Sequence, residues 1–432
     1  MSRPIVLVTG ANAGVGLGVC ERLLVQLSNP TPPDSAALDS GDHEVAGTPF
    51  HAAEGCTLLL ACRNQAKAAE AVTHLKQILA RLATADDLAV QKNTSPSRWA
   101  EASSSAVASA SSLRKREFTQ DDSAPLDTRT REARIHYRQS FCRGTIIEVI
   151  PLDLASLENT KACAKLITDK VPYLTHIILN AGGAAWIGVN WLWATWEILT
   201  SLHKAVTFPS YKLQRAGDKS DDGYGWVWQT NVGSHYVLVQ ALEPLLRRSP
   251  YAVPSRVIWT GSLEANRNDF HLDDFQCLDP RISPHPYEST KYQCELAALA
   301  MDERYVNTHD AHAPRVYTAH PGIVASSIFS TVIPSIMLLM MKLVFYLARW
   351  TFSPHHPIDA YKGAIAATFV AVAPPEALDS TARYGAQCTW TGTPYVHAGR
   401  LNGWHESSDG SPDPAIQGLA RELLTAYDRI LS

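Results

Sequence analysis

Short runs of apolar residues alternate along the 432-residue chain with longer segments whose apolar residues recur every three or four positions. This alternation predicts βαβ units around a parallel sheet, and the nearly continuous short runs are typical of strands covered on both faces. The expected strands are residues 5–9, 57–61, 145–150, 176–180, 256–260 and 316–320. The expected helices are residues 16–27, 65–82, 157–169, 226–246 and 287–306. The pattern therefore predicts an α/β fold with helices on both faces of the sheet.

Two polar stretches interrupt the alternation. Residues 28–53 are rich in proline, glycine and serine, and residues 84–140 combine a serine- and alanine-rich run with charges of both signs. Neither stretch is expected to bury enough apolar surface to offset the entropy lost on ordering it. We predict a single domain over residues 1–432 with two mobile insertions, and favour a solvated loop over a hidden binding motif in the longer one.

The composition is that of a globular protein: 46% of the residues are hydrophobic, 19% are charged, and the formal net charge is -4. These values exclude a wholly disordered or collagen-like chain, and charge near neutrality offers no electrostatic footprint for nucleic acid. The eight cysteines stand singly, without a C-x-x-C pair, which indicates a reduced, cytosol-facing protein with no metal site. The expected partner is a small molecule or a lipid.

A glycine-rich segment, residues 9–16, follows the first expected strand and opens the first expected helix. Glycines here allow a tight turn and bring helix amides close to a pyrophosphate, as in a doubly wound, Rossmann-type fold; an ordinary glycine turn is the alternative. At the end of the second strand an acidic residue would favour NAD, but this chain carries Arg63, which can pair with the 2′-phosphate of NADP. NADPH is therefore the predicted cofactor, against the alternative that Arg63 is an ordinary surface residue.

Tyr287 and Lys291 lie four residues apart, and therefore on one face of the last expected helix. Reducing a ketone requires a proton for the developing alkoxide, and a neighbouring ammonium lowers the pKa of a phenol by stabilising the phenolate. A serine hydroxyl can hold the carbonyl oxygen beside the phenol, and Ser262 follows the fifth expected strand. Together the three residues predict a ketone-reducing site.

With its motifs in this order, the chain resembles the short-chain dehydrogenase/reductase superfamily over nearly its whole length, apart from the two insertions. The resemblance implies that Tyr287 donates the proton, that Lys291 also binds the nicotinamide ribose and that Ser262 orients the carbonyl. It further implies that Asn231 supports a proton relay and that Asp153 lies near the adenine. The residues expected to contact the cofactor are Gly10, Asn12, Gly14, Val15, Gly16, Arg63, Asp153, Asn180, Ala181, Gly182, Tyr287, Lys291, Pro321, Gly322, Val324 and Ser326. For residues 180–182 a structural turn is the alternative.

Two further segments bear on the substrate. Residues 184–228 hold six of the 11 tryptophans, which suits a pocket for a flat apolar molecule; aromatic packing of a long loop is an equal alternative. Within residues 328–350, the run 333–347 is almost wholly apolar, interrupted by Pro334 and Lys342, and is shorter than the ~20 residues that span a bilayer. We expect a monotopic helix in the membrane interface, a cap over the substrate pocket, or both.

These segments are similar to the fungal 3-keto-steroid reductase branch of the superfamily. The similar stretches are residues 205–213, 219–223, 229–232, 345–349, 353–354 and 358–362. The resemblance implies reduction of a 3-keto sterol to the 3β-hydroxy sterol in sterol C-4 demethylation. It also implies a place on the cytosolic face of the endoplasmic reticulum membrane, or on lipid droplets, and other C-4 demethylation enzymes as partners. A reductase of retinoids or other lipid carbonyls, and a cofactor-binding scaffold for sterol enzymes, stay open as alternatives.

Overall fold

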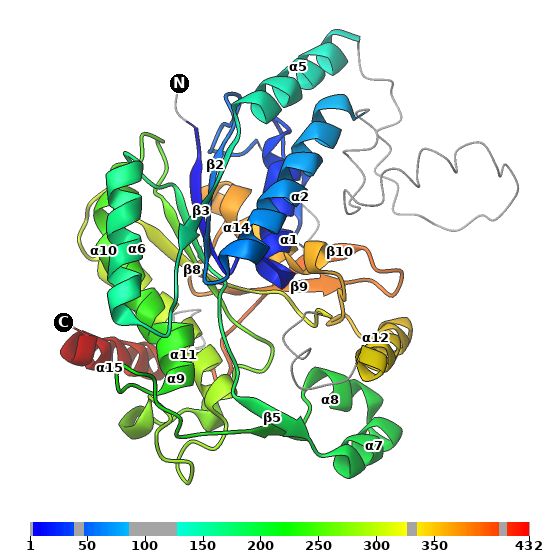
Figure 1. Ribbon diagram of the computed structural model, residues 1–432, viewed down its shortest axis with the longest axis vertical. Helices are drawn as coiled ribbons and strands as arrows, with labels where there is room; N and C mark the ends of the chain where they lie inside the picture. The colour runs from blue at the N-terminus through cyan, green and yellow to red at the C-terminus, as the bar shows by residue number, and fades with distance from the viewer. Residues whose placement is uncertain (1–2, 39–46, 86–127, 326–334, 406–412, 432) are drawn as a thin grey trace, which may run out of the picture.

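The computed structural model describes residues 3–38, 47–85, 128–325, 335–405 and 413–431. An eight-stranded sheet with helices on both faces forms its centre (Figure 1). The strands are β1 (Ile5–Thr9), β2 (Thr57–Cys62), β3 (Ile146–Pro151), β4 (His176–Leu179), β7 (Arg256–Thr260), β8 (Arg315–His320), β9 (Arg383–Cys388) and β10 (Pro394–Gly399). They lie in the order β10-β9-β8-β7-β4-β1-β2-β3, and every neighbouring pair is parallel except β9 and β10. The predicted single-domain, doubly wound sheet is confirmed.

The strand order reverses at the middle of the sheet, where β1 has β2 on one side and β4 on the other. In an open α/β sheet such a reversal leaves a crevice at the carboxyl ends of the strands, where ligands bind. The six predicted strands are all present, with ends that differ by one residue at most. Strands β9 and β10 extend the sheet beyond the prediction.

The two faces of the sheet carry separate helical layers. One layer contains α6 (Leu157–Lys170), α10 (Ser234–Leu246), α11 (Pro286–Val306) and α15 (Pro414–Leu431). The other contains α1 (Gly14–Leu27), α2 (Gln65–Thr84) and α14 (Ile365–Val372). Side chains alternate along a strand, so Ile5 and Leu7 pack on the first layer while Val6 and Val8 pack on the second. Both faces of β1 are therefore buried, which explains its continuous apolar run.

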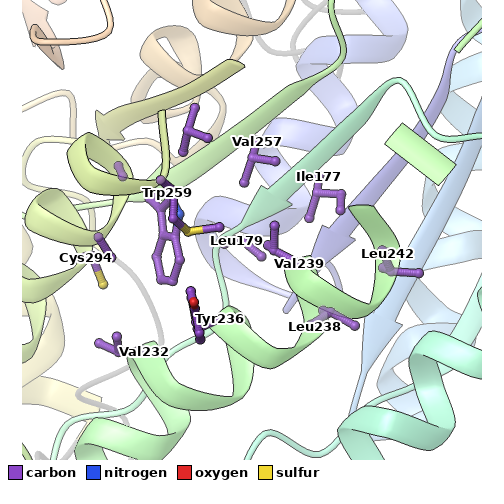
Figure 2. Packing of buried hydrophobic residues seen from close by; sticks show 14 of the residues in the cluster. Ile177, Leu179, Val232, Tyr236, Leu238, Val239, Leu242, Val257, Trp259 and Cys294 are labelled. Atoms are coloured by element: carbon purple, nitrogen blue, oxygen red, sulfur yellow. The ribbon is translucent and has the colours of Figure 1, made fainter. Parts of the chain in front are cut away.

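Figure 2 shows the first of these layers from close by. Strand residues Ile177, Leu179, Val257 and Trp259 pack there with Leu238, Val239 and Leu242 of α10. Each of these side chains is almost completely buried, and burying one such side chain stabilises the fold by ~1.5–3 kcal/mol. This packing fixes the ends of β4 and β7, which residues 180–182 and Ser262 follow.

The shorter predicted insertion is packed rather than mobile in its described parts, so that prediction is wrong for residues 28–38 and 47–53. A 3₁₀ helix, η1 (Pro33–Ala36), places Asp34 against Arg22 of α1, with contacts of 2.6 and 2.8 Å between fully buried groups. Phe50 is buried between the His176 ring, at 4.3 Å, and the Arg256 guanidinium, at 5.0 Å. An ion pair and one aromatic ring anchor this stretch, and composition does not reveal either.

The C-terminal part of the longer predicted insertion forms a helix. Residues 128–140, expected to be part of a mobile loop, belong to helix α5 (Thr128–Gly144), which packs on α2. Phe141 is buried there, and the buried Arg138 donates to the carbonyl of Ala85 at 3.1 Å. Most of the surface of α5 faces solvent, and its sequence is correspondingly polar. The polar composition therefore predicted a loop where the chain forms a packed helix. Residues 86–127 lie outside the described residues.

A further group of helices and strands extends beyond one end of the main sheet (Figure 1). It consists of a two-stranded antiparallel sheet, β5 (Trp186–Val189) with β6 (Lys212–Gln214), and of α7 (Trp191–Thr200), α8 (Leu202–Thr207) and α12 (Ser335–Trp350). Helix α12 packs on α8. Among the described residues, none of the helices combines the length and apolarity that crossing a bilayer requires.

The predicted helix 226–246 is interrupted. It consists of α9 (Trp226–Trp228), a π-helical turn η4 (Gln229–Gly233) and α10. Single π-helical turns are frequent at functional sites, and this one carries Asn231. The remaining short elements are η5 (Arg267–Asp269), η6 (Leu272–Asp274), α13 (Ala360–Gly363) and η8 (Pro375–Ala377).

Candidate active site

A cavity of about 660 Å³ lies at the carboxyl ends of β1, β4, β7 and β8. Its wall on the sheet side contains Gly10 after β1, residues 180–182 after β4, residues 260–262 at the end of β7, and residues 321–324 after β8. These are the positions at which an open α/β sheet binds its ligand. Most of the predicted site residues therefore meet at one cavity.

The glycine loop adopts a shape that needs glycine. Gly10 and Gly14 have φ angles of +67° and +55°, which side chains disfavour, and a Cβ on Gly16 would collide with the carbonyl of Gly10. Asn12 and Val15 line the cavity beside Gly10 and Gly14, whereas Gly16 packs the helix against the loop.

The first turn of α1 has no capping side chain and no acidic residue, so its backbone amides are free to bind an anion. A dinucleotide pyrophosphate fits these features.

The turn after β4 is both structural and part of the cavity wall. Thr9 Oγ1 accepts hydrogen bonds from the backbone amides of Asn180, at 2.9 Å, and Ala181, at 3.0 Å. The Asn180 side chain donates to the Thr9 carbonyl at 3.0 Å. Asn180 therefore ties β4 to the glycine loop, while Ala181 and Gly182 present backbone to the cavity. The structural interpretation of residues 180–182 therefore holds, and their contact with the cofactor stays a prediction.

Arg63 and Asp153 lie at neighbouring strand ends but do not line the main cavity. Arg63 follows β2 directly and is exposed, and β2 pairs in register with β3, which precedes Asp153. Asp153 accepts a hydrogen bond from the amide of Ala155 at 3.0 Å. The cofactor contacts of Arg63 and Asp153 stay predictions. Pro321, Gly322 and Val324 line the cavity as predicted, and Ser326 lies outside the described residues.

The three predicted chemical groups line the same wall. Tyr287 lies in the first turn of α11, Lys291 one turn later, and Ser262 follows β7. Burial raises the pKa of Tyr287, the nearby Glu264 raises it further, and a hydrogen bond with Ser262 opposes both. Lys291 Nζ donates to the carbonyl of Thr260 at 2.9 Å, and burial lowers the pKa of this amine. The arrangement keeps a neutral phenol beside a serine hydroxyl, with an amine one helical turn away.

Asn231 lies behind this wall rather than in it. Its side-chain oxygen accepts from the amide of Gly183 at 2.7 Å, and its side-chain amide donates to the Gly183 carbonyl at 2.9 Å and to Thr290 at 3.0 Å. Asn231 thus joins the turn after β4 to α11, and its part in a proton relay stays a prediction.

Comparison with known proteins places the chain in a family. No protein-family model matches it. The 3-keto-steroid reductase of Gibberella zeae is 30% identical over 402 residues, covering 87% of this chain and 75% of the relative. The chain belongs to the 3-keto-steroid reductase family. The 3-keto-steroid reductase of Aspergillus fumigatus is 27% identical and covers 96% of this chain and 85% of its own length.

Solved structures add little to this assignment. A short-chain type dehydrogenase/reductase from Mycobacterium ulcerans aligns with a TM-score of 0.44 at 14% identity, covering 87% of this chain and 86% of that one. Agreement at this level is too low to inform the site, so the arrangement of the 3-keto-steroid reductase site is taken from this chain alone.

The reductase site also contains charged groups that the sequence did not reveal. Lys212 of β6 lines the cavity and forms ion pairs with Glu264 and, at 3.3 Å, with Glu288. Its ammonium lies 5.0 Å from the Trp186 ring and 5.7 Å from the Tyr287 ring. Burial raises the pKa of Glu264, and Lys212 opposes that rise. Strand β6 has only three residues and gives no periodic pattern in the sequence. The one signal that could have indicated Lys212 is its charge within an aromatic-rich segment.

A second charged pair of the reductase contacts the backbone of Ser262. Arg383 of β9 donates to the carbonyl of Ser262 and forms an ion pair with Glu295 at 2.9 Å. Glu295 is fully buried in α11, and burial raises its pKa to about 7. Because β9 was not predicted, Arg383 was not recognised as part of the reductase site.

Away from Ser262, Tyr287 and Lys291, the wall of the cavity is apolar. It is formed by one face of α7 and one face of α12, through Trp191, Ala194, Thr195, Ile198, Met337, Met340, Met341, Val344 and Phe345. Of the six tryptophans in residues 184–228, Trp186 and Trp191 line the cavity of the reductase, while Trp228 is buried in the core. The pocket interpretation and the packing interpretation of this segment therefore apply to different tryptophans.

Proposed function

We propose that the protein reduces the 3-ketone of a sterol intermediate to the 3β-hydroxyl with NADPH, as part of sterol C-4 demethylation. One observation carries the proposal: in a chain of the 3-keto-steroid reductase family, Ser262, Tyr287 and Lys291 converge on a cavity whose opposite wall is apolar. A ketone at the end of a rigid hydrocarbon would meet the polar wall with its oxygen and the apolar wall with its rings.

The residues of the polar wall have separate tasks. When bound, NADPH supplies the hydride. The Tyr287 phenol holds a proton at its hydroxyl oxygen and donates it to the ketone oxygen, and its raised pKa keeps that proton in place until the oxygen becomes basic. The Ser262 hydroxyl holds the ketone oxygen beside the phenol. A protonated Lys291 stabilises the phenolate that remains.

Size and shape support a sterol. A cavity of about 660 Å³ lies within the ~300–1,000 Å³ of pockets that enclose small ligands. The Trp186 ring lies 5.4 Å from the Tyr287 ring, so a flat aromatic surface borders the reacting end. The methionines of α12 adapt their shape to a hydrocarbon more readily than branched residues do.

The cofactor and the cellular place are parts of the same proposal. NADPH is supported by the uncapped first turn of α1 and by Arg63, in the absence of an acid, at the end of β2. The proposed place is the cytosolic face of the endoplasmic reticulum membrane, with lipid droplets second and other C-4 demethylation enzymes as partners. Exposed apolar residues of α12, such as Leu339 and Leu343, support contact with a membrane surface.

The test follows NADPH oxidation by the purified 432-residue chain with several 3-keto sterols and with retinal. We expect turnover with 3-keto sterols, little with retinal, and a 3β-hydroxy product.

Arg63→Ala is expected to raise the KM for NADPH about tenfold and to leave the KM for NADH unchanged, since one charge-assisted contact is lost. A chain that reduces retinal well and no 3-keto sterol would overturn the substrate, and an unchanged KM for NADPH would overturn the role of Arg63.

A further inference from the structure

Helix α7 is apolar on two opposite faces. Ala194, Thr195 and Ile198 face the cavity, at the spacing of one helical face. Leu192, Trp196 and Leu199, on the other side, are 88%, 61% and 79% exposed. A helix at the surface of a soluble protein carries polar residues on its outer face, and α7 does not. Its outer face is built for contact with something other than water.

Helix α12 repeats this arrangement. Met337, Met341 and Val344 face the cavity, while Ile336, Leu339, Leu343, Leu347 and Trp350 are exposed. The small apolar cluster formed by Val206 of α8 with Phe345 and Ala348 of α12 holds the helices together. Figure 1 shows α7, α8 and α12 at the same end of the molecule.

The exposed apolar residues of α7 and α12 lie at the same end of the molecule, and we call them together the docking face. Its residues are Leu192, Trp193, Trp196, Leu199, Ile336, Leu339, Leu343, Leu347 and Trp350. Other large exposed apolar residues, such as Leu166 on α6 and Val306 on α11, are isolated on different elements. Large apolar side chains exposed together at one end of a molecule are typical of a protein or membrane interface.

Two large apolar side chains next to the docking face line the cavity and are themselves exposed. Trp191 of α7 and Met340 of α12 both line the cavity, and they are 48% and 52% exposed. A side chain can meet both conditions only where the cavity reaches the surface. The mouth of the cavity therefore opens beside the docking face, with one of these side chains on each helix.

The charges around the docking face favour a lipid over an acidic partner. No aspartate or glutamate occurs in residues 321–358, and the only one in residues 184–217 is Glu197, which is buried and bound by Ser210. Lys342 on α12 is exposed, and so is Lys204 on α8, which also pairs with Glu197 at 3.3 Å. Exposed lysines beside an apolar surface complement anionic phospholipid headgroups.

We propose that the docking face of α7 and α12 lies on a phospholipid bilayer and that the sterol ketone passes from the bilayer into the cavity between Trp191 and Met340. This rests on the proposed function, because a sterol is the ligand that partitions into the bilayer. The substrate then enters the site without crossing water. The two-sided apolar character of α7 and α12 follows, since each helix contacts lipid on one face and sterol on the other.

The test compares one double variant on the docking face with a matched control. Trp196→Glu/Leu343→Glu changes two exposed residues that do not line the cavity, and Leu166→Glu/Val306→Glu makes similar changes at isolated exposed positions. Binding is measured by sedimentation with vesicles of phosphatidylcholine and phosphatidylserine. NADPH oxidation is measured with a 3-keto sterol supplied either in these vesicles or from a cyclodextrin solution.

We expect the docking-face variant to lose at least about tenfold in vesicle binding and in rate with vesicle-borne sterol, because two apolar side chains that contact lipid are replaced by charged ones. Its rate with cyclodextrin-borne sterol should stay within about twofold of the unmodified chain, and the control should behave like the unmodified chain in all assays.

Three results would overturn the proposal. The first is an unmodified chain that does not bind vesicles, which would point to a protein on this face. The second is a docking-face variant whose rate with vesicle-borne sterol is unchanged. The third is a docking-face variant that loses equal rate with vesicle-borne and cyclodextrin-borne sterol. Failure of the proposed function is distinct, because the unmodified chain would then reduce no 3-keto sterol from cyclodextrin either.

Discussion

The two walls of the cavity are made in different ways. The polar wall consists of strand ends and the first turns of α1 and α11, and its groups are held by hydrogen bonds that involve the backbone, such as those that Asn180 after β4 donates to Thr9. The apolar wall consists of α7 and α12, which lie outside the main sheet and both pack on α8. Chemistry is therefore placed on a rigid scaffold, and substrate contact on appended helices.

This difference separates two kinds of constraint. A reacting group must lie within a fraction of an ångström of its target, and the sheet supplies that precision. A wall that holds a hydrocarbon needs only shape and apolar surface, which many side chains can supply. Substitutions on the polar wall should therefore change rate constants, and substitutions on the apolar wall should change affinity for the sterol.

The largest expected effect is on the polar wall. Tyr287→Phe removes the proton donor but keeps the ring that packs near Trp186, so the fold should be retained. We expect kcat to fall about 10²–10⁴-fold, the usual contribution of general acid catalysis, with little change in the KM for NADPH. Steady-state NADPH oxidation with a 3-keto sterol measures both values.

Tyr211→Phe is the matched control on the other side. Tyr211 lines the cavity too, and its hydroxyl donates to the carbonyl of Ala205 at 2.9 Å. Losing one such hydrogen bond should change kcat by less than about fivefold. Equal losses in the two variants would contradict the assignment of Tyr287. A Tyr287→Phe chain that supports normal sterol synthesis in cells would favour the scaffold role instead.

The same division decided what could be predicted from sequence. The polar wall was predicted almost residue by residue, because its function depends on local backbone geometry: a positive φ at Gly10, or a Tyr and a Lys one helical turn apart on α11. Arg383 and Lys212 were missed because they reach the site through pairing of distant strands, which local sequence does not encode. The described parts of the insertions were misjudged for a related reason, since a single buried contact such as Arg22 with Asp34 outweighs a polar composition.

The junction between the two walls should show an intermediate effect. Lys212 comes from β6, beside α7, and pairs with Glu264 and Glu288 near Tyr287, with only 4% of its side chain exposed. Lys212→Met leaves these carboxylates without their cation, and breaking a buried pair in this way costs ~3–5 kcal/mol of unfolding free energy. Chemical denaturation at pH 8 should show this loss.

The pH dependence of that loss has a definite sign. Burial raises the pKa of Glu264 above its ordinary value of 4.5, and removing Lys212 raises it further. A carboxyl whose pKa is raised on folding binds protons more tightly in the folded chain, so stability falls as the pH rises between the two values. The deficit of Lys212→Met should therefore be largest at pH 8 and shrink towards pH 5. Adding Glu264→Gln should restore part of the stability at pH 8.

The exposed pair of Lys165 with Asp169 serves as the control for this experiment, since their side chains are 77% and 62% exposed. Lys165→Met should leave the unfolding free energy unchanged at both pH values, because exposed ion pairs contribute little. If Lys212→Met and Lys165→Met behaved alike, the two walls would not be joined by a buried ion pair, and the orientation of β6 beside Tyr287 would need another cause.

The smallest effect is expected on the apolar wall. Met341→Ala removes a side chain of α12 that lines the cavity and is only partly buried in the cluster around Phe345. The lost contact with sterol is worth ~1–2 kcal/mol, so the KM for a 3-keto sterol should rise by about tenfold or somewhat less, while kcat changes little. The KM for a small, water-soluble ketone should not change, because such a ketone does not reach α12.

Met301→Ala separates this effect from a loss of packing. Met301 is buried in the core formed by α11 with the sheet and does not line the cavity. Its truncation should lower the unfolding free energy by ~2–5 kcal/mol and leave the KM for the sterol unchanged. A rise in sterol KM for Met301→Ala as large as that for Met341→Ala would mean that sterol affinity depends on the stability of the whole fold. The apolar wall would then not be a separate, substrate-binding part of the molecule.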